Sequence, residues 1–580
     1  MQSDTFEALP APLMELVGRV VRTTRLWPSE RRDVQAELES HFREGLIELT
    51  QEGLSLDESV EALRDGFGNP ELAAKLIRRG KKRGRPMFWK FMIGTAVAGL
   101  TGVGAGAGYV AVAYFGKPSP TVDYVAKINE PVARTAEDDR AWPILRDVIL
   151  QMKETAAAHE ARNSLPLPGE ATWPEAMAWL SENRGLLPLI AEASDKPVFG
   201  FVYNDVKTHE FMIARARARG LHDEAQRLEA AGVVEDPLAP PTVMILLPHL
   251  SDVRDMGRLL VLDARDRFYH GDFVGAWQSL DTVYRLGMQL VGGQTLIEQL
   301  VGRAMLALAG QDMRRMLFDV RDTITADQLA AVTASRALRE PKRVLRADLD
   351  GEQLFFQDVV QYVFTDDGNG NGRLIPSQFD KVSWLGAEVP VEQSAEKLAR
   401  EARTMSIAAV HADRRDTLAK YFELWTRMKE LLALPLYDSR RAELPSLVDQ
   451  AVQGELGGRK YALVGLLLPS LSNADQSMRE ADMELSALHA LVAVLAYRLE
   501  NGVYPAQLRD LSGGGLTREP VDAYSGMYLR FRMNSAGMPI LYSVGRNLTD
   551  DGGSAEPVEV MPGGRASPRD IVYWPETLGR

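Results

Sequence analysis

The sequence predicts a mainly α protein: a small cytoplasmic helical bundle, a single transmembrane helix, and a multi-helix ectodomain with a small antiparallel β element at the C-terminus. Apolar residues recur at helical spacing along most of the chain, one long stretch carries no charge, and strand-like runs with turn signals come only after residue 501. The predicted domains are a cytoplasmic module (1–86), the transmembrane helix (87–116), a helical ectodomain (117–366 and 379–501), an Asp/Asn/Gly loop within it (367–378), and the β-rich C-terminal element (502–580).

The composition excludes several classes of chemistry. The 580 residues include no Cys, so disulfides, thiol nucleophiles, Cys-ligated zinc and iron–sulfur clusters are all ruled out. Residues 1–90 hold 15 basic and 15 acidic side chains, so the whole net charge of −13 falls after residue 90. Because an acidic surface repels phosphate backbones, we expect no nucleic-acid partner there.

The first 80 residues read as four short helices. Apolar spacing predicts helices over residues 13–26 and 29–52, and Gly53 ends the second of them. A capping box that begins at Ser55 starts a third helix, and Asn69 followed by Pro70 starts a fourth.

The motifs of this segment are Glu37-x-Glu39-x-His41, Gly53-x-Ser55, Phe67-Gly68-Asn69-Pro70 and Leu72-Ala73. Over about residues 12–80 this layout resembles the permease prefix domain and the related HAAS helical signalling domain of bacteria. Ser59-Val60 departs from the family pattern, which has Ala after its Glu. The resemblance implies a regulatory or interaction module, in which His41 lies on a helix surface or an interface.

Residues 91–116 carry no charge and predict a membrane span. As a helix, 25 residues cover about 37 Å, enough to cross a hydrocarbon core about 30 Å thick. Seven Lys and Arg side chains precede the span, so the positive-inside rule places the N-terminus in the cytoplasm and the C-terminal part in the periplasm, as in a single-pass inner-membrane signal anchor. A buried soluble helix and a signal peptide cleaved after Ala113 are the alternatives.

The predicted span is rich in glycine. Two GxxxG spacings occur, Gly102 with Gly106 and Gly104 with Gly108. Small residues one turn apart let helix backbones approach closely, which predicts homo- or hetero-association within membrane lipid. The alternative is that glycine is simply frequent in membrane spans.

Helical patterns continue through the rest of the chain to residue 501. A stem is expected at 121–131, and the predicted helices are 142–159, 174–181, 206–219, 222–231, 258–270, 273–290, 297–317, 326–338, 342–364, 391–405, 413–434 and 472–501. The pair joined at Gly271-Asp272 resembles one tetratricopeptide-type hairpin, without a second copy at that period. Charged residues bound the apolar half of 472–501 too closely for a second span, so we expect a core helix.

The pattern changes after residue 501. Strands are predicted at 528–533 and 539–544 around a turn at 534–537, with a third at 571–574. The Tyr504-Pro505 turn, the Asp-rich loop and the strand pair resemble the globular end of type II secretion major pseudopilins over about residues 484–553. No prepilin cleavage signal is present, so the resemblance implies a fold element only. The whole layout also resembles bacterial membrane-anchored proteins of unassigned activity.

Two loops are candidates for a weak calcium site. In the first, Asp367, Asn369, Asn371 and Gly372 match positions 1, 3, 5 and 6 of an EF-hand loop. Gln378 stands where a bidentate Glu belongs, which predicts weak affinity. The alternative is a Gly/Asn-rich connector without metal.

The second candidate loop contains Asp550 and Asp551, with Asp522 and Ser525 expected nearby. Its alternative is a solvated turn that closes the hairpin.

No nucleotide-binding, zinc-protease or serine-hydrolase motif is present. We therefore expect no enzyme and no required cofactor, but a scaffold or signalling protein that links cytoplasmic and extracytoplasmic protein partners. The alternative is an envelope hydrolase with a carboxylate-based site in the helical ectodomain.

Overall fold

The chain folds as two units, Met1–Val110 and Ala111–Arg580, each considered by itself below. The computed structural model describes residues 9–24, isolated positions between 35 and 64, and residues 116–574 except 154–163, 205, 232–239, 244, 246, 340–344, 384–393, 454–457, 469–471, 512–519, 536, 555–556 and 561–565.

In the first unit the structure describes helix α1, Ala11–Thr24. Leu13, Val17 and Val20 lie on one stripe of this helix and are fully or almost fully buried, as its amphipathic spacing predicts. The other predicted helices of this unit fall mainly outside the described residues, and so does the resemblance to the prefix domain that rests on them.

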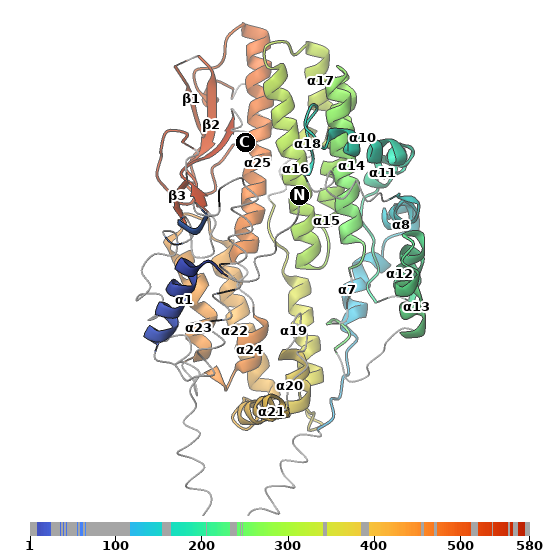
Figure 1. The fold of residues 1–580 in the computed structure, drawn as a ribbon, viewed down its shortest axis with the longest axis vertical. Helices are drawn as coiled ribbons and strands as arrows, with labels where there is room; N and C mark the ends of the chain where they lie inside the picture. Colours follow the sequence, from blue (N-terminus) through green and yellow to red (C-terminus); the bar gives the residue numbers. More distant parts are fainter. Residues whose placement is uncertain are drawn as a thin grey trace, which may run out of the picture. The chain divides into compact units, whose positions relative to one another are not determined.

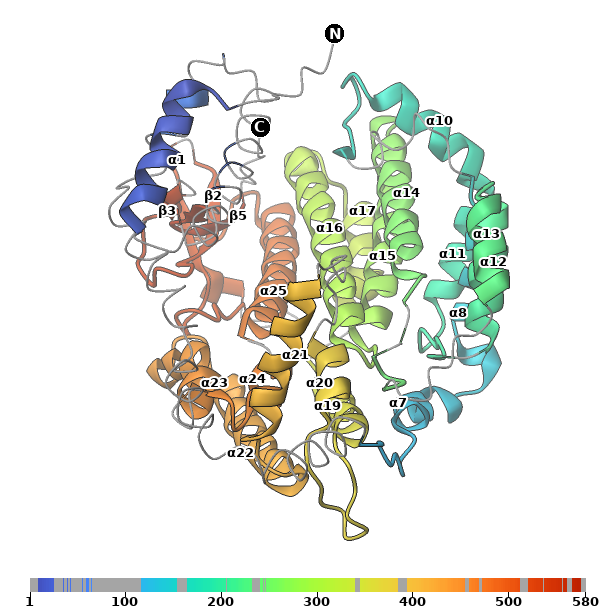
Figure 2. The same ribbon diagram turned by 60° about the horizontal axis from the view of Figure 1, so that its bottom comes forward.

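The second unit is mainly helical (Figures 1 and 2). Its first helices are α7 (Tyr124–Ala133), η1 (Glu137–Asp139), α8 (Trp142–Gln151), α10 (Trp173–Asn183), η2 (Arg184–Leu186), α11 (Leu187–Ser194), α12 (Val206–Ala218) and α13 (His222–Ala231). The central ones are α14 (Leu250–Tyr269), α15 (Phe273–Val291), α16 (Leu296–Val320), α17 (Ala326–Ala334), α18 (Arg336–Arg339), α19 (Asp350–Val363), α20 (Pro376–Ser383) and α21 (Ser394–Ala408). The last are α22 (Arg414–Ala433), η3 (Ser439–Glu443), α23 (Leu444–Gln453), α24 (Ala462–Leu467), α25 (Ser472–Asn501) and η5 (Leu508–Leu511).

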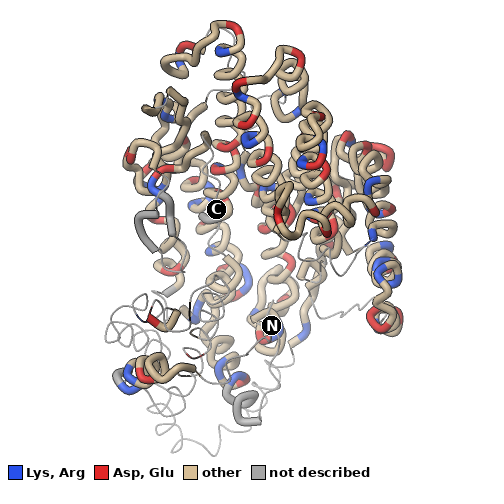
Figure 3. The backbone as a smooth tube through the Cα atoms, turned by 45° about the horizontal axis from the view of Figure 1, so that its top comes forward, with Lys and Arg blue, Asp and Glu red and all other residues tan. Residues whose placement is uncertain are grey.

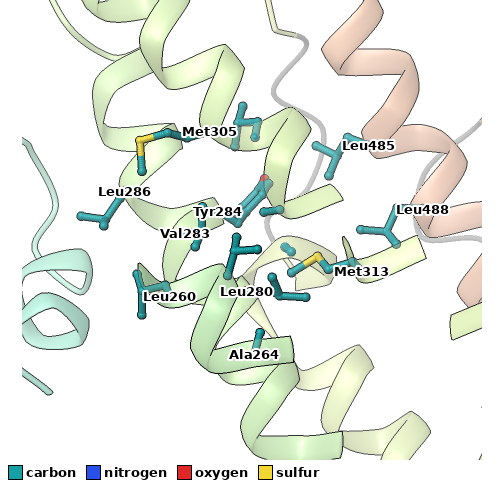
Figure 4. Packing of buried hydrophobic residues seen from close by; sticks show 14 of the residues in the cluster. Leu260, Ala264, Leu280, Val283, Tyr284, Leu286, Met305, Met313, Leu485 and Leu488 are labelled. Carbon is teal, nitrogen blue, oxygen red and sulfur yellow. The ribbon is translucent and has the colours of Figure 1, made fainter. Parts of the chain in front are cut away.

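Helices α14, α15, α16 and α25 form the centre of this unit, with α16 between α15 and α25 (Figure 1). Leu260, Leu280, Met313 and Leu488, one from each helix, are buried in the same cluster (Figure 4). In both ribbon views α8 and α10–α13 lie on the α14 side, and the sheet lies on the α25 side (Figures 1 and 2). The central helices therefore separate two different sets of peripheral elements.

Local signals explain where these helices begin. Gly271, with a φ of 83°, turns the chain, and the Asp272 side chain accepts a hydrogen bond from the N–H of Gly275 as the N-cap of α15. Thr295 and Glu298 form a complete capping box at the start of α16.

Two glycines let α15 and α16 approach closely. A Cβ at Gly302 would lie 2.6 Å from both the carbonyl O of Gly287 and the N of Val291. Only glycine fits this crossing without moving backbone, so the sequence itself sets the separation of the two helices.

A second apolar cluster is built from α19, α20, α22, α23 and α24. The Phe356 and Tyr421 rings stack with centroids 3.6 Å apart, and Trp425 stacks on Tyr421. This cluster positions the loop between α19 and α20, which contains the first predicted calcium residues.

The β element follows α25. Strands β1 (Arg530–Met533), β2 (Pro539–Ser543) and β5 (Ile571–Trp574) form an antiparallel sheet in the order β1-β2-β5. Strands β3 (Pro557–Val560) and β4 (Ala566–Pro568) form a separate antiparallel pair. The buried Tyr573 and Trp574 of β5 anchor the three-stranded sheet, which contacts α16 and α25.

The transmembrane helix of the predicted fold class, and with it the membrane and signal-anchor assignments, must be corrected. Among the described residues no helix is long and apolar enough to cross a membrane. Helix α25 has 30 residues, but Asp475, Arg479 and Glu484 in its first half leave only a short apolar run, which packs in the core. Residues 91–115, where the span was predicted, and Gly102, Gly104, Gly106 and Gly108 lie outside the described residues.

Some element boundaries also differ from the prediction. The expected stem at 121–131 is largely helix α7, which Asp123 caps through the N–H of Ala126 and which tolerates Pro131 near its end. Helix α14 begins eight residues before the predicted start at 258, and α19 begins at Asp350 rather than 342. Helices α11, α20, α23 and α24 were not predicted, since each is ten residues or shorter and gives little periodic signal.

Candidate functional site

The first predicted calcium loop is a tight hairpin closed by its own hydrogen bonds. Phe364 and Leu374 form an antiparallel bridge at its base. One carboxylate oxygen of Asp367 accepts hydrogen bonds from the N–H groups of Asn369 (2.8 Å) and Asn371 (3.1 Å). These donors hold the pKa of Asp367 below its ordinary value.

Two of the other three predicted ligands, Asn371 and Gln378, have differently placed side chains. Asn371 points to the start of α22, where it donates to Asp413 (3.0 Å) and accepts from the N–H of Arg415 (3.0 Å). Gln378 lies buried in α20, after the hairpin has closed. A calcium ion would therefore compete with Arg415 for the oxygen of Asn371.

The glycines of this loop also differ from an EF-hand. The left-handed turns are at Gly368 (φ 84°) and Gly370 (φ 81°), at positions 2 and 4. Gly372, at position 6, is needed for another reason: a Cβ there would collide with the carbonyl O of Thr365 across the hairpin. The spacing that predicted calcium is thus explained by hairpin geometry, and calcium binding stays a prediction.

The second predicted loop folds over one face of the sheet. Asp550 accepts hydrogen bonds from the Tyr542 hydroxyl (2.9 Å) and from Arg530 (3.2 Å), and Asp551 accepts from the side chain of Asn547 (2.8 Å). The adjacent backbone is held by the buried Asp570, which accepts from the N–H of Gly553 at 2.6 Å.

Asp522 and Ser525, which were expected near Asp550 and Asp551, bond to each other. Asp522 is fully buried and accepts from Ser525 (3.0 Å), Ser543 (2.8 Å) and the N–H of Val544 (3.2 Å). Within the described residues, no three His, Asp or Glu side chains converge as metal ligands would. The acids of this element hold its loops to the sheet.

A buried polar cluster joins α14, α16 and the segment before α12. The Tyr203 hydroxyl donates to Glu298 at 2.5 Å, and the same carboxylate oxygen accepts from the Thr295 hydroxyl at 2.9 Å. His249, completely buried, lies with its Nε2 3.8 Å from the other oxygen of Glu298. That separation is too long for a hydrogen bond.

Aromatic rings enclose the imidazole of His249. The centroid of Phe201 is 4.0 Å away, and those of Trp142 and Phe199 are each 5.3 Å away. Both ring nitrogens are buried without a hydrogen-bond partner. Burial lowers the pKa of His249, and the opposing charges of Glu298 and Asp252 only partly offset this effect, so the ring is neutral at pH 7.

The Tyr203 hydroxyl titrates even less readily. Burial, followed by the charge of Glu298, raises its pKa well above the ordinary value. The chemistry this cluster supplies is therefore a short hydrogen bond to a carboxylate and a buried neutral base. The sequence analysis did not identify any residue of this cluster, although Thr295 and Glu298 have the spacing of a capping box.

Buried aspartates pair with arginines, some from other helices and some one turn away in the same helix. The pairs, called the aspartate clasps here, are Asp252 with Arg215 and Arg219, Asp263 with Arg267, Asp312 with Arg265, and Asp475 with Arg441 and Arg479. Figure 3 shows acidic and basic residues interspersed along the helices of the second unit. Most of these clasps connect separate helices, so this charge is used to hold the fold together.

One group of large apolar side chains lies exposed beside the sheet. Tyr437 (49% exposed) packs against Gly526, next to Met527 (54%), and Val521 (40%) is bridged to the following residue, Tyr528. We call Tyr437, Val521 and Met527 the Tyr437 patch. Its members come from two places far apart in sequence, so no local pattern could have predicted it.

No protein-family model matches this chain, and neither a curated protein nor a solved structure matches it. The resemblances drawn from its motifs therefore stay expectations, and the functional argument rests on the chain's own residues.

Proposed function

We propose that this protein is a non-enzymatic scaffold that binds a protein partner through the second unit. The observation that carries the proposal is the Tyr437 patch. Exposed apolar side chains that gather at one place favour contact with another protein, because burying them there removes apolar surface from water.

The burial and contacts of the patch support a preformed surface. Tyr437 is fixed against the backbone at Gly526, whose φ of 70° and close approach leave no room for a side chain. The adjoining turn is held by the buried Asp522, which accepts hydrogen bonds from Ser543, the last residue of β2, and from the N–H of Val544 after it. A partner would therefore meet a surface that loses little conformational freedom on binding.

The buried acids favour this function over the alternative of a carboxylate-based hydrolase. Asp252, Asp312 and Asp475 each pair with arginine, Asp358 accepts from Thr242 and Gln361, and Glu298 accepts from Tyr203. Groups committed to such contacts hold elements together rather than activate water. The first unit, by its resemblance to prefix modules, would hold a partner of its own.

Site-specific photo-crosslinking in cells tests the proposal. A photoreactive residue at Met527 is expected to form one dominant crosslinked product, and Tyr437→Asp should abolish it while circular dichroism stays unchanged. The matched control is the same residue at Val206, which is 59% exposed on α12. Equal products at the two positions, or none at Met527, would refute the proposal.

A further inference from the structure

The sequence contains three Asn-Gly pairs: Asn369-Gly370, Asn371-Gly372 and Asn501-Gly502. Asparagine is chemically labile in such a pair, because the backbone nitrogen of the next residue can attack its side-chain amide. Glycine has no Cβ to shield that nitrogen, and its backbone turns readily into the geometry that the attack requires. The three pairs therefore share the same intrinsic reactivity, and the fold decides which of them reacts.

The side chain of Asn371 is held at both of its polar atoms. Its amide nitrogen donates to Asp413 (3.0 Å), and its oxygen accepts from the N–H of Arg415 (3.0 Å). The glycine that follows, Gly372, is packed so closely that a Cβ there would collide with the carbonyl O of Thr365. The side-chain amide and the attacking nitrogen can therefore meet only after these contacts open.

Asn501 is protected by the end of a helix. It is the last residue of α25, and its side-chain amide donates to the carbonyl O of Tyr497 at 2.8 Å. The N–H of Gly502 donates to the carbonyl O of Arg498, also at 2.8 Å. The nitrogen that would attack is thus already committed to a backbone hydrogen bond.

Asn369 is exposed in the turn of the first predicted calcium loop and precedes Gly370, which has a φ of 81°. Its backbone makes its hydrogen bonds: the N–H donates to Asp367 (2.8 Å), and the carbonyl accepts from Arg415 (3.4 Å). Among the described residues, none is hydrogen-bonded to its side-chain amide. The N–H of Gly370 makes one long contact, 3.3 Å to Asp366, in an exposed position. Little therefore opposes the approach of this nitrogen to the amide.

We propose that Asn369 is a site of spontaneous modification, which converts through a succinimide to aspartate and isoaspartate while Asn371 and Asn501 stay intact. The nitrogen of Gly370 gives up its proton and bonds to Cγ of Asn369, the Cγ–Nδ2 bond breaks, and the amide nitrogen leaves with that proton as ammonia. Water then opens the ring. Cleavage of the new N–Cγ bond gives aspartate, and cleavage at the original backbone carbonyl gives isoaspartate, so water is the only reagent consumed.

The product changes the charge of the loop. Either acid replaces a neutral amide by a carboxylate in a turn that already contains Asp366 and Asp367. Arg415, which donates to the backbone carbonyl of Asn369, is placed to pair with the new carboxylate. The full-length protein should therefore become more acidic as it ages, and the modified hairpin keeps a counter-ion at the start of α22.

Peptide mapping of the full-length protein by mass spectrometry tests the proposal. The protein is incubated at mildly alkaline pH, each site is followed by the mass gained when an amide becomes an acid, and fragmentation separates Asn369 from Asn371. Conversion at Asn369 should be at least about tenfold faster than at Asn371 or Asn501, because each of those sites must first lose two hydrogen bonds. In urea, which unfolds the chain, the three sites should convert at similar rates.

Asp413→Ala is the matched variant. It removes the acceptor of the Asn371 amide, so conversion at Asn371 should rise several-fold, while conversion at Asn369 and Asn501 stays unchanged. Equal rates at the three sites of the folded protein, or faster conversion at Asn371 than at Asn369, would overturn the proposal. So would an intact Asn369 in folded protein whose three sites all convert in urea.

Discussion

Replacing Gly302 by Ala tests whether the contact between α15 and α16 is set by backbone approach. The added Cβ would lie 2.6 Å from the O of Gly287 and the N of Val291, and 2.9 Å from Cβ of Leu290. The two nearest atoms are backbone, which no rotamer change can move. The helices must therefore separate by several tenths of an ångström, and the buried side chains around the crossing lose contact.

The size of the effect follows from two opposing terms. Overpacking of this kind costs about 1–3 kcal/mol, at the upper end where backbone meets backbone. Alanine is favoured over glycine in a helix by about 1 kcal/mol. We expect Gly302→Ala to destabilise the second unit by about 1–2 kcal/mol.

Gly310 on α16 and Gly287 on α15 provide matched controls. A Cβ at Gly310 would meet only the end of the flexible Arg314 side chain, at 3.3 Å, so Gly310→Ala should stabilise by about 0.5–1 kcal/mol. A Cβ at Gly287 would meet the O of Gly302 at 3.0 Å and Leu306 at 3.1 Å, which predicts an intermediate effect.

Amide hydrogen exchange of α15 and α16 is the appropriate assay. It reports local opening free energies in a chain with two units, where a single unfolding transition is not assured. Protection against amide exchange should be highest in Gly310→Ala, intermediate in Gly287→Ala and lowest in Gly302→Ala. Equal protection in the Gly302 and Gly310 variants would show that the close approach does not determine stability.

Three other predictions address buried charge and the loops. Burial lowers the pKa of His249, so the folded state resists a proton that the unfolded state accepts near pH 6.5, and stability should be full above that pH and fall below it. In His249→Phe the melting temperature should depend less on pH between about pH 5 and 6.5. An unchanged dependence of the melting temperature on pH would contradict this. Asp475→Asn leaves Arg441 and Arg479 buried without their counter-ion, so it should lower the free energy of unfolding in urea by about 3–5 kcal/mol. The control is Asp322→Asn, whose carboxylate is exposed beside Arg498 and whose loss should cost less than about 1 kcal/mol. If the first loop binds calcium, millimolar calcium should add about 0.4–1.4 kcal/mol to the free energy of unfolding and raise the melting temperature, and Asp367→Ala should abolish this rise. If calcium leaves the wild-type melting curve unchanged, hydrogen bonds alone close the loop.

Helices with clear local signals could be predicted from the sequence. The Gly271-Asp272 turn fixes the start of α15, and the predicted 222–231 helix coincides with α13. The predicted helix boundaries were wrong where tertiary contacts extend or end a helix. Helix α14 begins at Leu250 because His249 and Leu250 are buried among residues distant in sequence. The helix predicted at 142–159 is confirmed only through Gln151, and residues 154–163 are not described.

The candidate site could not be predicted by the same reasoning. Local spacing identified Asp367, Asn369 and Asn371 correctly as one loop, but the spacing serves a hairpin whose partners, Asp413 and Arg415, begin another helix. Spacing also cannot show that Tyr203 donates to Glu298, 95 positions away. Motif reasoning finds groups that lie close along the chain, whereas this fold brings its buried polar groups together from separate helices.

The pseudopilin-like motif illustrates where sequence and structure give complementary information. The predicted strands and the turn at 534–537 correspond to β1, β2 and their hairpin, and Ile571–Trp574 is the third strand. The pattern of residues did not indicate which residues of β1 would bond to β2, because that depends on the strand order β1-β2-β5 and on the register. Once the register is known, alternation assigns the backbone groups of Arg530 and Arg532 to the ladder with β2. The arginine side chains are then explained by the loop that follows β2, because Arg530 pairs with Asp550 and Arg532 donates to the carbonyl of Gly552.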